Sequence, residues 1–276
     1  MSVEPLDEVG FRALTAKIAA ERGFGCANYK DGCLRRRIAV RMRARGTLDF
    51  MTYGSLLDRD PAEYEALLDA LTINVTKLYR DAAVWGMLAQ QIIPALWSLD
   101  VPRLEIWSAG CASGEELYTL AALLHQHAER TATQPRLRHV RIRGSDIDRA
   151  SLDAARRGVY ATDAFAEMPV DLRVRYFSQT EPHIAAPELR ALIEVERRDL
   201  LSEPAPSGGL HLITCRNVII YFDRPSQEPL LRRFHDALVP GGFLVLGKVE
   251  TLMGPTRALF EPVDQRNRIF RRAVAG

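Results

Sequence analysis

The chain has 276 residues, of which 47% are hydrophobic and 26% are charged. These proportions are typical of an ordinary globular protein, and they exclude intrinsic disorder and fibrous repeats. The formal charge of +2 indicates neither a nucleic acid nor an anionic membrane as a partner. No apolar run approaches the roughly 20 residues that span a bilayer, and the acidic N-terminal segment does not resemble a secretory signal. A cytoplasmic location is therefore expected.

The cysteines and histidines lack the spacing of metal ligands. The four cysteines are widely separated and include no CxxC pair, and the six histidines are scattered along the chain. Zinc sites use closely paired ligands, and disulfide frameworks are typical of small secreted chains. We therefore expect neither a metal site nor a disulfide framework.

Residues 1–90 are predicted to form a small all-helical domain. Apolar residues recur there at intervals of three and four positions, which is the period of a helix with one buried face. Glycine or proline separates the helical segments, which cover residues 7–22, 31–45, 48–58 and 61–72.

The second helical segment is strongly basic. Between residues 30 and 45 the chain carries seven basic side chains and one acidic side chain. A buried stripe is predicted for Leu34, Ile38 and Met42. The arginines next to this stripe divide into two that point away from it, Arg36 and Arg43, and two that flank it, Arg37 and Arg41. A partner surface and a solvated helix face are both compatible with this pattern.

From about residue 100, strands and helices alternate, which predicts a doubly wound parallel sheet within residues 91–276. The predicted strands are 103–109, 140–148, 192–201, 210–222, 243–248 and 266–272, and the predicted helices are 115–130, 149–158 and 226–238. Scattered prolines indicate a small, loop-rich subdomain inserted around residues 159–194. In such a sheet the ligand lies at the carboxyl ends of the strands.

The first predicted strand leads into a glycine turn, Ala109-Gly110-Cys111-Ala112-Ser113-Gly114. Its Gly-x-x-x-Gly spacing is not the dinucleotide motif GxGxxG. Glu115 and Glu116 follow at the start of the helix, where they place negative charge in the position of a diphosphate. These acids either compensate the helix dipole or bind a cationic ligand.

Polar residues also end the next three strands. Asp146 is predicted to accept hydrogen bonds from ribose hydroxyl groups, and Asp148 to cap the following helix. Asp199 is either a loop aspartate or a residue that reads an adenine edge. The fourth strand ends in Cys215-Arg216-Asn217. We interpret Cys215 as a small buried side chain rather than a nucleophile, because no histidine has a recognisable relation to it.

The segment of residues 71–81 joins the two parts of the chain. Asn74, Thr76 and Arg80 recur within it at short intervals. Arg80 is suited to pair with a carboxylate of a ligand or a substrate. The alternative is a helix that Thr76 caps, and the residues alone favour this alternative.

Several of these stretches, in order along the chain, resemble the CheR-type methyltransferases of bacterial chemotaxis, which use S-adenosylmethionine. The similar stretches are residues 71–81, 106–124, 144–160, 199–201, 212–223 and 240–250. The resemblance extends to residue 272. It implies a Rossmann-like methyltransferase domain, which is preceded by a small all-α domain and contains a small inserted subdomain.

Carried over by position, the resemblance implies a set of contacts to S-adenosylmethionine: Asn74, Thr76, Arg80, Glu115 (with Glu116 as the alternative), Asp146, Asp199, Leu200, Arg216 and Asn217. We expect Arg80 and Tyr221 to lie beside the reacting groups, as the catalytic residues. The receptor contacts implied by the basic helix are Arg36, Arg37, Arg41 and Arg43. Two positions depart from the family pattern, since the family commonly has Asn at position 199 and His at position 248.

The resemblance further implies that the protein methylates glutamate side chains on the cytoplasmic helical bundle of chemoreceptors and releases S-adenosylhomocysteine. Glutamate is ionised at neutral pH, with an unperturbed pKa of about 4.3, so in-line methyl transfer needs no general base. We expect a monomer that neither inserts into a membrane nor binds nucleic acid. The alternatives are a nucleic-acid methyltransferase and a non-catalytic signalling module that binds S-adenosylmethionine.

Overall fold

The computed structural model describes residues 5–72, 76–206 and 209–273. The chain divides into two compact units. Unit 1 consists of Met1–Ile73 with Tyr221–Gln227, and unit 2 of Asn74–Ile220 with Glu228–Gly276. Among the described helices, none combines the length and the apolar composition that crossing a membrane requires.

Unit 1 is helical, and its helices confirm the predicted segments. They are α1 (Pro5–Arg22), the short 3-10 helix η1 (Cys26–Asn28), α2 (Asp31–Ala44), α3 (Phe50–Leu57) and α4 (Pro61–Leu71). The side chains of Asp49 and Asp60 cap α3 and α4 by accepting backbone N–H groups of the first turn. The predicted apolar stripe of α2 is buried, as expected: Leu34, Ile38 and Met42.

The segment Tyr221–Gln227 belongs to unit 1 although it lies far along the chain. The Lys30 N–H donates to the Tyr221 carbonyl at 3.0 Å, and the Asp223 N–H donates to the Asn28 carbonyl at 2.9 Å. The rings of Tyr29 and Phe222 meet edge to face, with their centroids 5.2 Å apart. The sequence instead assigns part of this segment to a strand over 210–222. That prediction is wrong beyond Cys215, where the strand ends.

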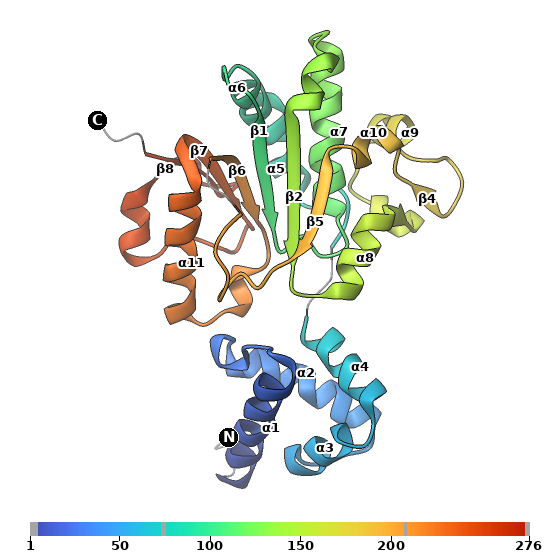
Figure 1. Cartoon of the computed structure of the whole chain (residues 1–276), viewed down its shortest axis with the longest axis vertical. Coiled ribbons are helices and arrows are strands. Elements are labelled where there is room, and N and C mark those ends of the chain that lie inside the picture. Colours follow the sequence, from blue (N-terminus) through green and yellow to red (C-terminus); the bar gives the residue numbers. More distant parts are fainter. Residues whose placement is uncertain (1–4, 73–75, 207–208, 274–276) are drawn as a thin grey trace. The chain divides into compact units, whose positions relative to one another are not determined.

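Unit 2 contains, within its described residues, a seven-stranded sheet of order β5-β2-β1-β6-β7-β9-β8 (Figure 1). Its strands are β1 (Leu104–Ala109), β2 (Val140–Asp146), β5 (Ile193–Arg197), β6 (Leu210–Cys215), β7 (Leu238–Leu246), β8 (Phe260–Asp264) and β9 (Ile269–Arg272). The first five strands in that order are parallel, and β9 and β8 are antiparallel additions. Strand β8 is not among the strands predicted from the sequence.

Helices cover both faces of the sheet. They are α5 (Ala82–Met87), the π-helix η2 (Leu88–Ile92), α6 (Ile93–Trp97), α7 (Glu115–Arg130), α8 (Arg149–Arg157) and α11 (Arg224–Ala237). Three short 3-10 helices lie in the connections: η3 (Gln134–His139), η5 (Ile219–Tyr221) and η6 (Gly254–Leu259). Phe234 of α11 contacts Trp107, whereas Leu117 of α7 packs over Gly144 beside Ser108. Because Trp107 and Ser108 are successive strand residues, α11 and α7 lie on opposite faces.

The helices of residues 82–97 belong to unit 2, although the sequence groups most of them with an all-helical domain of 1–90. Trp85, Leu88 and Ile92 are buried in one core cluster with Ile106 and Ile142 of the sheet. The division between the compact units therefore falls earlier in the chain, between residues 73 and 74. Local helical periodicity does not reveal which core a helix joins.

A small subdomain follows α8. It contains the two-residue antiparallel strands β3 (Val159–Tyr160) and β4 (His183–Ile184), the 3-10 helix η4 (Thr162–Phe165), and the helices α9 (Val170–Tyr176) and α10 (Pro187–Arg190). The rings of Tyr160, Phe165 and Phe177 pack edge to face at its centre. Tyr160 also donates its hydroxyl to the Ser113 carbonyl at 3.0 Å, which ties the subdomain to the glycine turn.

Candidate functional site

The glycine turn between β1 and α7 is tightly packed. Gly110 and Gly114 both have positive φ angles, 81° and 92°. A Cβ atom at Gly110 would lie 2.5 Å from Val218, and one at Gly114 would lie 2.9 Å from the Ala155 Cβ. Glycine is therefore needed at both positions, because other residues seldom adopt this backbone conformation and because neighbouring side chains leave no space for a Cβ atom.

Glu115 is a buried carboxylate at the first position of α7. Glu115 as a whole is 6% exposed, and the Ser113 hydroxyl lies 2.9 Å from each of its carboxylate oxygens. Burial raises the pKa of Glu115 to about 7, and the hydrogen bond from Ser113 opposes this rise only in part. A carboxylate in this state gains stability from a cation brought next to it.

Glu116, the neighbouring acid, is committed to contacts within the protein. Its carboxylate accepts hydrogen bonds from Ser108 at 2.8 Å and from Thr214, and it pairs with Arg216 at 3.2 Å. These partners come from β1 and from the end of β6. The contrast between the two acids favours Glu115 over Glu116 as the contact for a cationic ligand.

Asp146 ends β2 next to the glycine turn. Its carboxylate accepts the Ala112 N–H at 2.9 Å and the Asp148 N–H at 3.0 Å. Burial raises its pKa above the usual range, although these backbone hydrogen bonds oppose the rise. Asp148 caps α8 by accepting the N–H groups of Ala150 and Ser151, which confirms the predicted cap.

Asp199 has the contacts of a loop aspartate. Its carboxylate accepts the Leu201 N–H at 2.9 Å and the Ser202 hydroxyl at 2.7 Å, and so closes the turn after β5. The next residue, Leu200, has its carbonyl bound by Arg233. Contact of Asp199 and Leu200 with an adenine ring stays a prediction.

Arg216 lies at the end of β6, and its side chain is only 3% exposed. Its guanidinium pairs with Asp81 at 2.9 Å and with Glu116 at 3.2 Å, and it donates to the Arg80 carbonyl at 2.8 Å. These Nη atoms are thus occupied by protein acceptors, and a direct contact of Arg216 with a ligand stays a prediction. Cys215 beside it is fully buried, as expected, and burial raises the pKa of its thiol well above the usual value.

The segment that carries Arg80 is not helical. Residues 76–81, which the structure describes, are not helical: a turn covers Leu78 and Tyr79, and the next helix begins at Ala82. The alternative interpretation, a helix capped by Thr76, is therefore wrong. Asn74, the other polar residue predicted to act here, lies outside the described residues.

Glu250 is an organising residue that sequence analysis missed. Its carboxylate is buried and accepts backbone N–H groups from Gly247 at 2.6 Å, Asn217 at 3.0 Å, Val218 at 2.8 Å and Ile220 at 3.3 Å. Burial raises its pKa, and these four hydrogen bonds oppose the rise. Glu250 thereby fixes the loops after β6 and β7, including Asn217 at a φ of 60°. The available signal was an acid shortly after a strongly apolar strand.

The four arginines predicted to contact a partner differ in their surroundings within unit 1. Arg41 forms two hydrogen bonds, at 3.0 and 2.5 Å, with the buried carboxylate of Glu63. Arg37 donates to the Ala70 carbonyl at 2.6 Å, and its guanidinium carbon lies 5.6 Å from the centroid of the Tyr221 ring. Arg36 and Arg43 are exposed, and neither has a hydrogen-bond or ion-pair partner among the described residues.

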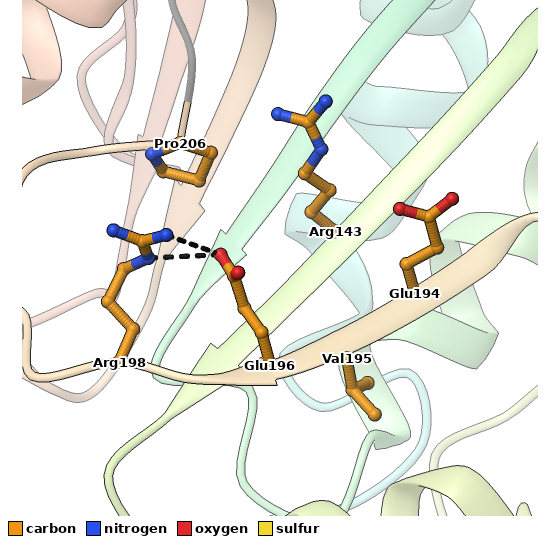
Figure 2. A pocket seen from close by; sticks show the side chains of 6 residues that line it. All are labelled: Arg143, Glu194, Val195, Glu196, Arg198 and Pro206. Carbon is orange, nitrogen blue, oxygen red and sulfur yellow. Dashed lines mark hydrogen bonds and ion pairs between the residues drawn. The ribbon is translucent and has the colours of Figure 1, made fainter.

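A separate cavity of about 320 Å³ lies beside β2 and β5 (Figure 2). It is lined by Arg143, Glu194, Val195, Glu196, Arg198 and Pro206, which include none of the predicted site residues. Its arginines are paired with neighbouring carboxylates, Arg198 with Glu196 at 2.7 Å and Arg143 with Glu105 at 3.3 Å. Within the described ranges, no group of three or more His, Cys, Asp and Glu side chains is arranged to hold a metal ion.

The fold and the carboxyl-end residues together define a class of protein. A sheet of this order, parallel apart from β9 and β8, with one acid at the end of β2, another at the start of α7 and no diphosphate motif, has the form of a Rossmann-like nucleoside-binding domain. Residues 74–269 match the family described as "CheR methyltransferase, SAM binding domain", and residues 10–72 match "CheR methyltransferase, all-alpha domain". The chain belongs to this family, and S-adenosylmethionine (SAM) is the cofactor of its second domain.

Named relatives align over most of the chain. It is 33% identical over 266 residues to a chemotaxis protein methyltransferase of Klebsiella aerogenes, and the alignment covers 93% of this chain and 88% of that protein. Identity to chemotaxis protein methyltransferase 2 of Pseudomonas aeruginosa is 34% over 250 residues, with coverages of 88% and 86%. An uncharacterized 104.1 kDa protein of Rhodobacter capsulatus is 34% identical over 271 residues; the alignment covers 97% of this chain but 28% of that protein.

The polar atoms at this edge of the sheet fit SAM. The cofactor presents ribose hydroxyl groups and an ammonium group, which are hydrogen-bond donors, together with a positively charged sulfur. Asp146 and Glu115 are acceptors when ionised. An ionised carboxylate offers about four acceptor positions, so each of these residues keeps capacity beyond the bonds described above.

Proposed function

We propose that this protein is a protein-glutamate O-methyltransferase, which transfers the methyl group of SAM to glutamates on the cytoplasmic helical bundle of chemoreceptors. The match of both domains to one methyltransferase family carries the proposal. The relatives named chemotaxis protein methyltransferase, which align over most of this chain, support the receptor as substrate. We further propose that the protein acts in the cytoplasm as a monomer.

In this proposal Asp146 accepts hydrogen bonds from the ribose hydroxyl groups, and Glu115 accepts them from the ammonium group. The other cofactor contacts in the proposal are Asn74, Thr76, Arg80, Asp199, Leu200, Arg216 and Asn217. When bound, SAM supplies a methyl group that is already activated by a positively charged sulfur. The protein therefore contributes by binding and orienting SAM and the glutamate side chain and by excluding water, rather than by providing a nucleophile.

The proposed reaction needs neither a general base nor a nucleophile from the protein. A glutamate side chain is ionised at neutral pH, because its unperturbed pKa is about 4.3, and needs no general base. The buried thiols of Cys111 and Cys215 have pKa values raised well above the usual range by burial, so they are unsuited to act as nucleophiles. We propose that Arg80 and Tyr221 lie beside the reacting groups and orient the incoming carboxylate.

The exposed arginines of α2 suit an acidic partner. Arg36 and Arg43 project into solvent, and their charges are not neutralised by any described residue. Arg37 and Arg41 are held by contacts within unit 1, so we propose that they act in receptor binding mainly by keeping α2 in place. Glutamate-rich receptor helices would supply the complementary charge.

The direct test is to incubate the protein with methyl-labelled SAM and a receptor cytoplasmic fragment, and then to treat the product with mild alkali. We expect volatile labelled methanol, because carboxyl esters hydrolyse under these conditions. A receptor fragment whose glutamates are replaced by glutamine is the matched control and should yield none. Alkali-stable label, label confined to RNA, or SAM binding without S-adenosylhomocysteine release in the presence of receptor would each contradict the proposal.

A further inference from the structure

The main chain at Arg80 is held by two side chains from different elements. The Arg80 carbonyl accepts the indole N–H of Trp85 at 2.8 Å and a guanidinium N–H of Arg216 at 2.8 Å. Trp85 comes from α5, and Arg216 from the end of β6. Both side chains are buried. Two donors on one carbonyl fix its direction more closely than a single bond does.

The backbone around this carbonyl is unusual. Tyr79 and Asp81, on either side of Arg80, have φ angles of 60° and 64°. Residues other than glycine seldom adopt this left-handed conformation, and they keep it only where the surroundings enforce it. Thr119 provides one such restraint, since its hydroxyl accepts the Tyr79 N–H at 3.0 Å, and Glu167 provides another by accepting the Asp81 N–H at 2.8 Å.

The two donors are themselves fixed. The Arg216 guanidinium pairs with Glu116 and Asp81, and it lies 5.0 Å from the centroid of the Trp85 ring. Lys248, which follows β7, pairs with the second oxygen of Asp81 at 3.0 Å. The Arg80 segment is therefore held between α5, α7 and the ends of β6 and β7.

We propose that Trp85 and Arg216 are positioning residues for Arg80, which set the direction in which its side chain leaves the backbone. The inference rests on the role proposed above for Arg80 beside the cofactor and the reacting carboxylate. In this inference the guanidinium of Arg216 acts through Arg80, so the cofactor contact proposed above for Arg216 would come from its main-chain atoms. Neither residue takes part in the chemistry.

Trp85→Phe is the variant that tests this inference, because it keeps an aromatic ring in the core while it removes the indole N–H. The smaller ring also leaves a void at this buried position, and a Trp→Phe control elsewhere in the same core measures that part of the effect. We expect SAM affinity and kcat/KM for the receptor each to fall about five- to tenfold, the effect of one lost hydrogen bond. In the Arg80→Ala background the same substitution should have almost no further effect. A double-mutant cycle measures this non-additivity.

Trp97→Phe is the matched control. Trp97 belongs to the same core cluster and also donates its indole N–H, to the Thr133 hydroxyl at 2.9 Å. Its ring contacts are with His127 and Arg136, and among the described residues 76–81 it has no hydrogen-bond or ring partner. We expect this variant to leave SAM affinity unchanged and to add independently to Arg80→Ala. If Trp85→Phe changes SAM affinity as little as Trp97→Phe does, or if its effect on SAM affinity adds fully to that of Arg80→Ala, the inference is wrong.

Arg216→Lys provides a second measurement. A single ammonium group keeps the positive charge for Glu116 and Asp81, but it lacks the planar fork that also reaches the Arg80 carbonyl. We expect the loss in SAM affinity to exceed that of Trp85→Phe and to shrink in the Arg80→Ala background. An additive loss would overturn the inference. The double-mutant cycles with Arg80→Ala are measured by SAM calorimetry as well as by turnover. They therefore remain informative if the receptor proves not to be the substrate.

Discussion

Two pairs of carboxylates at this edge of the sheet have contrasting surroundings: Glu115 with Asp146, and Glu116 with Glu250. Glu115 and Asp146 are contacted by a hydroxyl group and by backbone N–H groups, which leave part of their acceptor capacity open. Glu116 instead pairs with a buried guanidinium, and Glu250 accepts four backbone N–H groups. The comparison indicates that the first pair is available to a ligand and that the second pair holds the loops in place.

The largest effect is expected from Glu250→Ala, which should damage stability. The substitution removes the acceptor of four backbone N–H groups, and each buried unsatisfied donor costs about 1–3 kcal/mol. We expect the free energy of unfolding in urea to fall by about 4 kcal/mol or more. Glu261→Ala is the control, since this half-exposed side chain pairs with Arg271 at the surface and should contribute about 1 kcal/mol at most. Equal losses in the two variants would remove Glu250 from its structural role.

Asp146→Asn should separate binding from stability. The loss of charge weakens the proposed bonds to the ribose, and a hydrogen bond to a charged group contributes about 1.5–3 kcal/mol, so we expect a 10- to 100-fold rise in the Kd for SAM. Asp148→Asn, two residues away, is the matched control, because asparagine caps a helix about as well as aspartate. Titration calorimetry of both variants decides the question. A similar Kd for both would exclude Asp146 from the site.

The raised pKa of Glu115 predicts a pH dependence. In the folded protein this pKa is about 7 instead of 4.5, so below pH 7 most Glu115 side chains are neutral and cannot pair with an ammonium group. SAM affinity should therefore rise as pH increases toward 7, by up to about tenfold per pH unit, and level off above it. Glu115→Gln should flatten this profile. A slope that persists in the variant would assign the titration to another group.

The same shift has a consequence for stability. Between pH 4.5 and 7 the folded state without cofactor binds more protons at Glu115 than the unfolded state does. The contribution of this residue to the free energy of unfolding is therefore largest below that window and declines as pH rises through it. Denaturant unfolding at several pH values, compared with Glu115→Gln, measures the contribution. An identical pH dependence in both proteins would contradict it.

The smallest effects are expected on the exposed face of α2. Replacing both Arg36 and Arg43 by alanine should raise KM for the receptor fragment severalfold, most strongly at low salt, and change stability by about 0.5 kcal/mol at most. Arg59→Ala, at another exposed arginine of unit 1, should leave KM unchanged. Arg41→Ala should instead lower stability, because Glu63 would be left buried without its main partner. An unchanged KM in the double variant would reject this face as the receptor surface.

The parts of the fold that depend on local pattern could be predicted from the sequence. The helices of unit 1, the buried stripe of α2, helix α7 and the cap at Asp148 all depend on residues within a few positions of one another. The alternation of strands and helices likewise indicated the doubly wound sheet. Each of these patterns comes from residues that are close together in the sequence, and these residues also lie close together in the folded protein.

Contacts between distant residues could not be predicted in this way. Arg216 lies 100 positions from Glu116 and 135 from Asp81, and no local period links them. The return of Tyr221–Gln227 to unit 1 and the four N–H groups gathered by Glu250 are equally non-local. Polar residues at strand ends could therefore be identified as site candidates, but not sorted into ligand contacts and loop restraints.

A crystal structure of the protein with S-adenosylhomocysteine would show whether Asp146 and Glu115 bind the cofactor. We expect the ribose hydroxyl groups within hydrogen-bond distance of the Asp146 carboxylate, and the amino group of the ligand beside Glu115 at the start of α7. A ligand bound instead in the cavity lined by Arg143 and Arg198, or a ribose without contact to Asp146, would contradict this expectation.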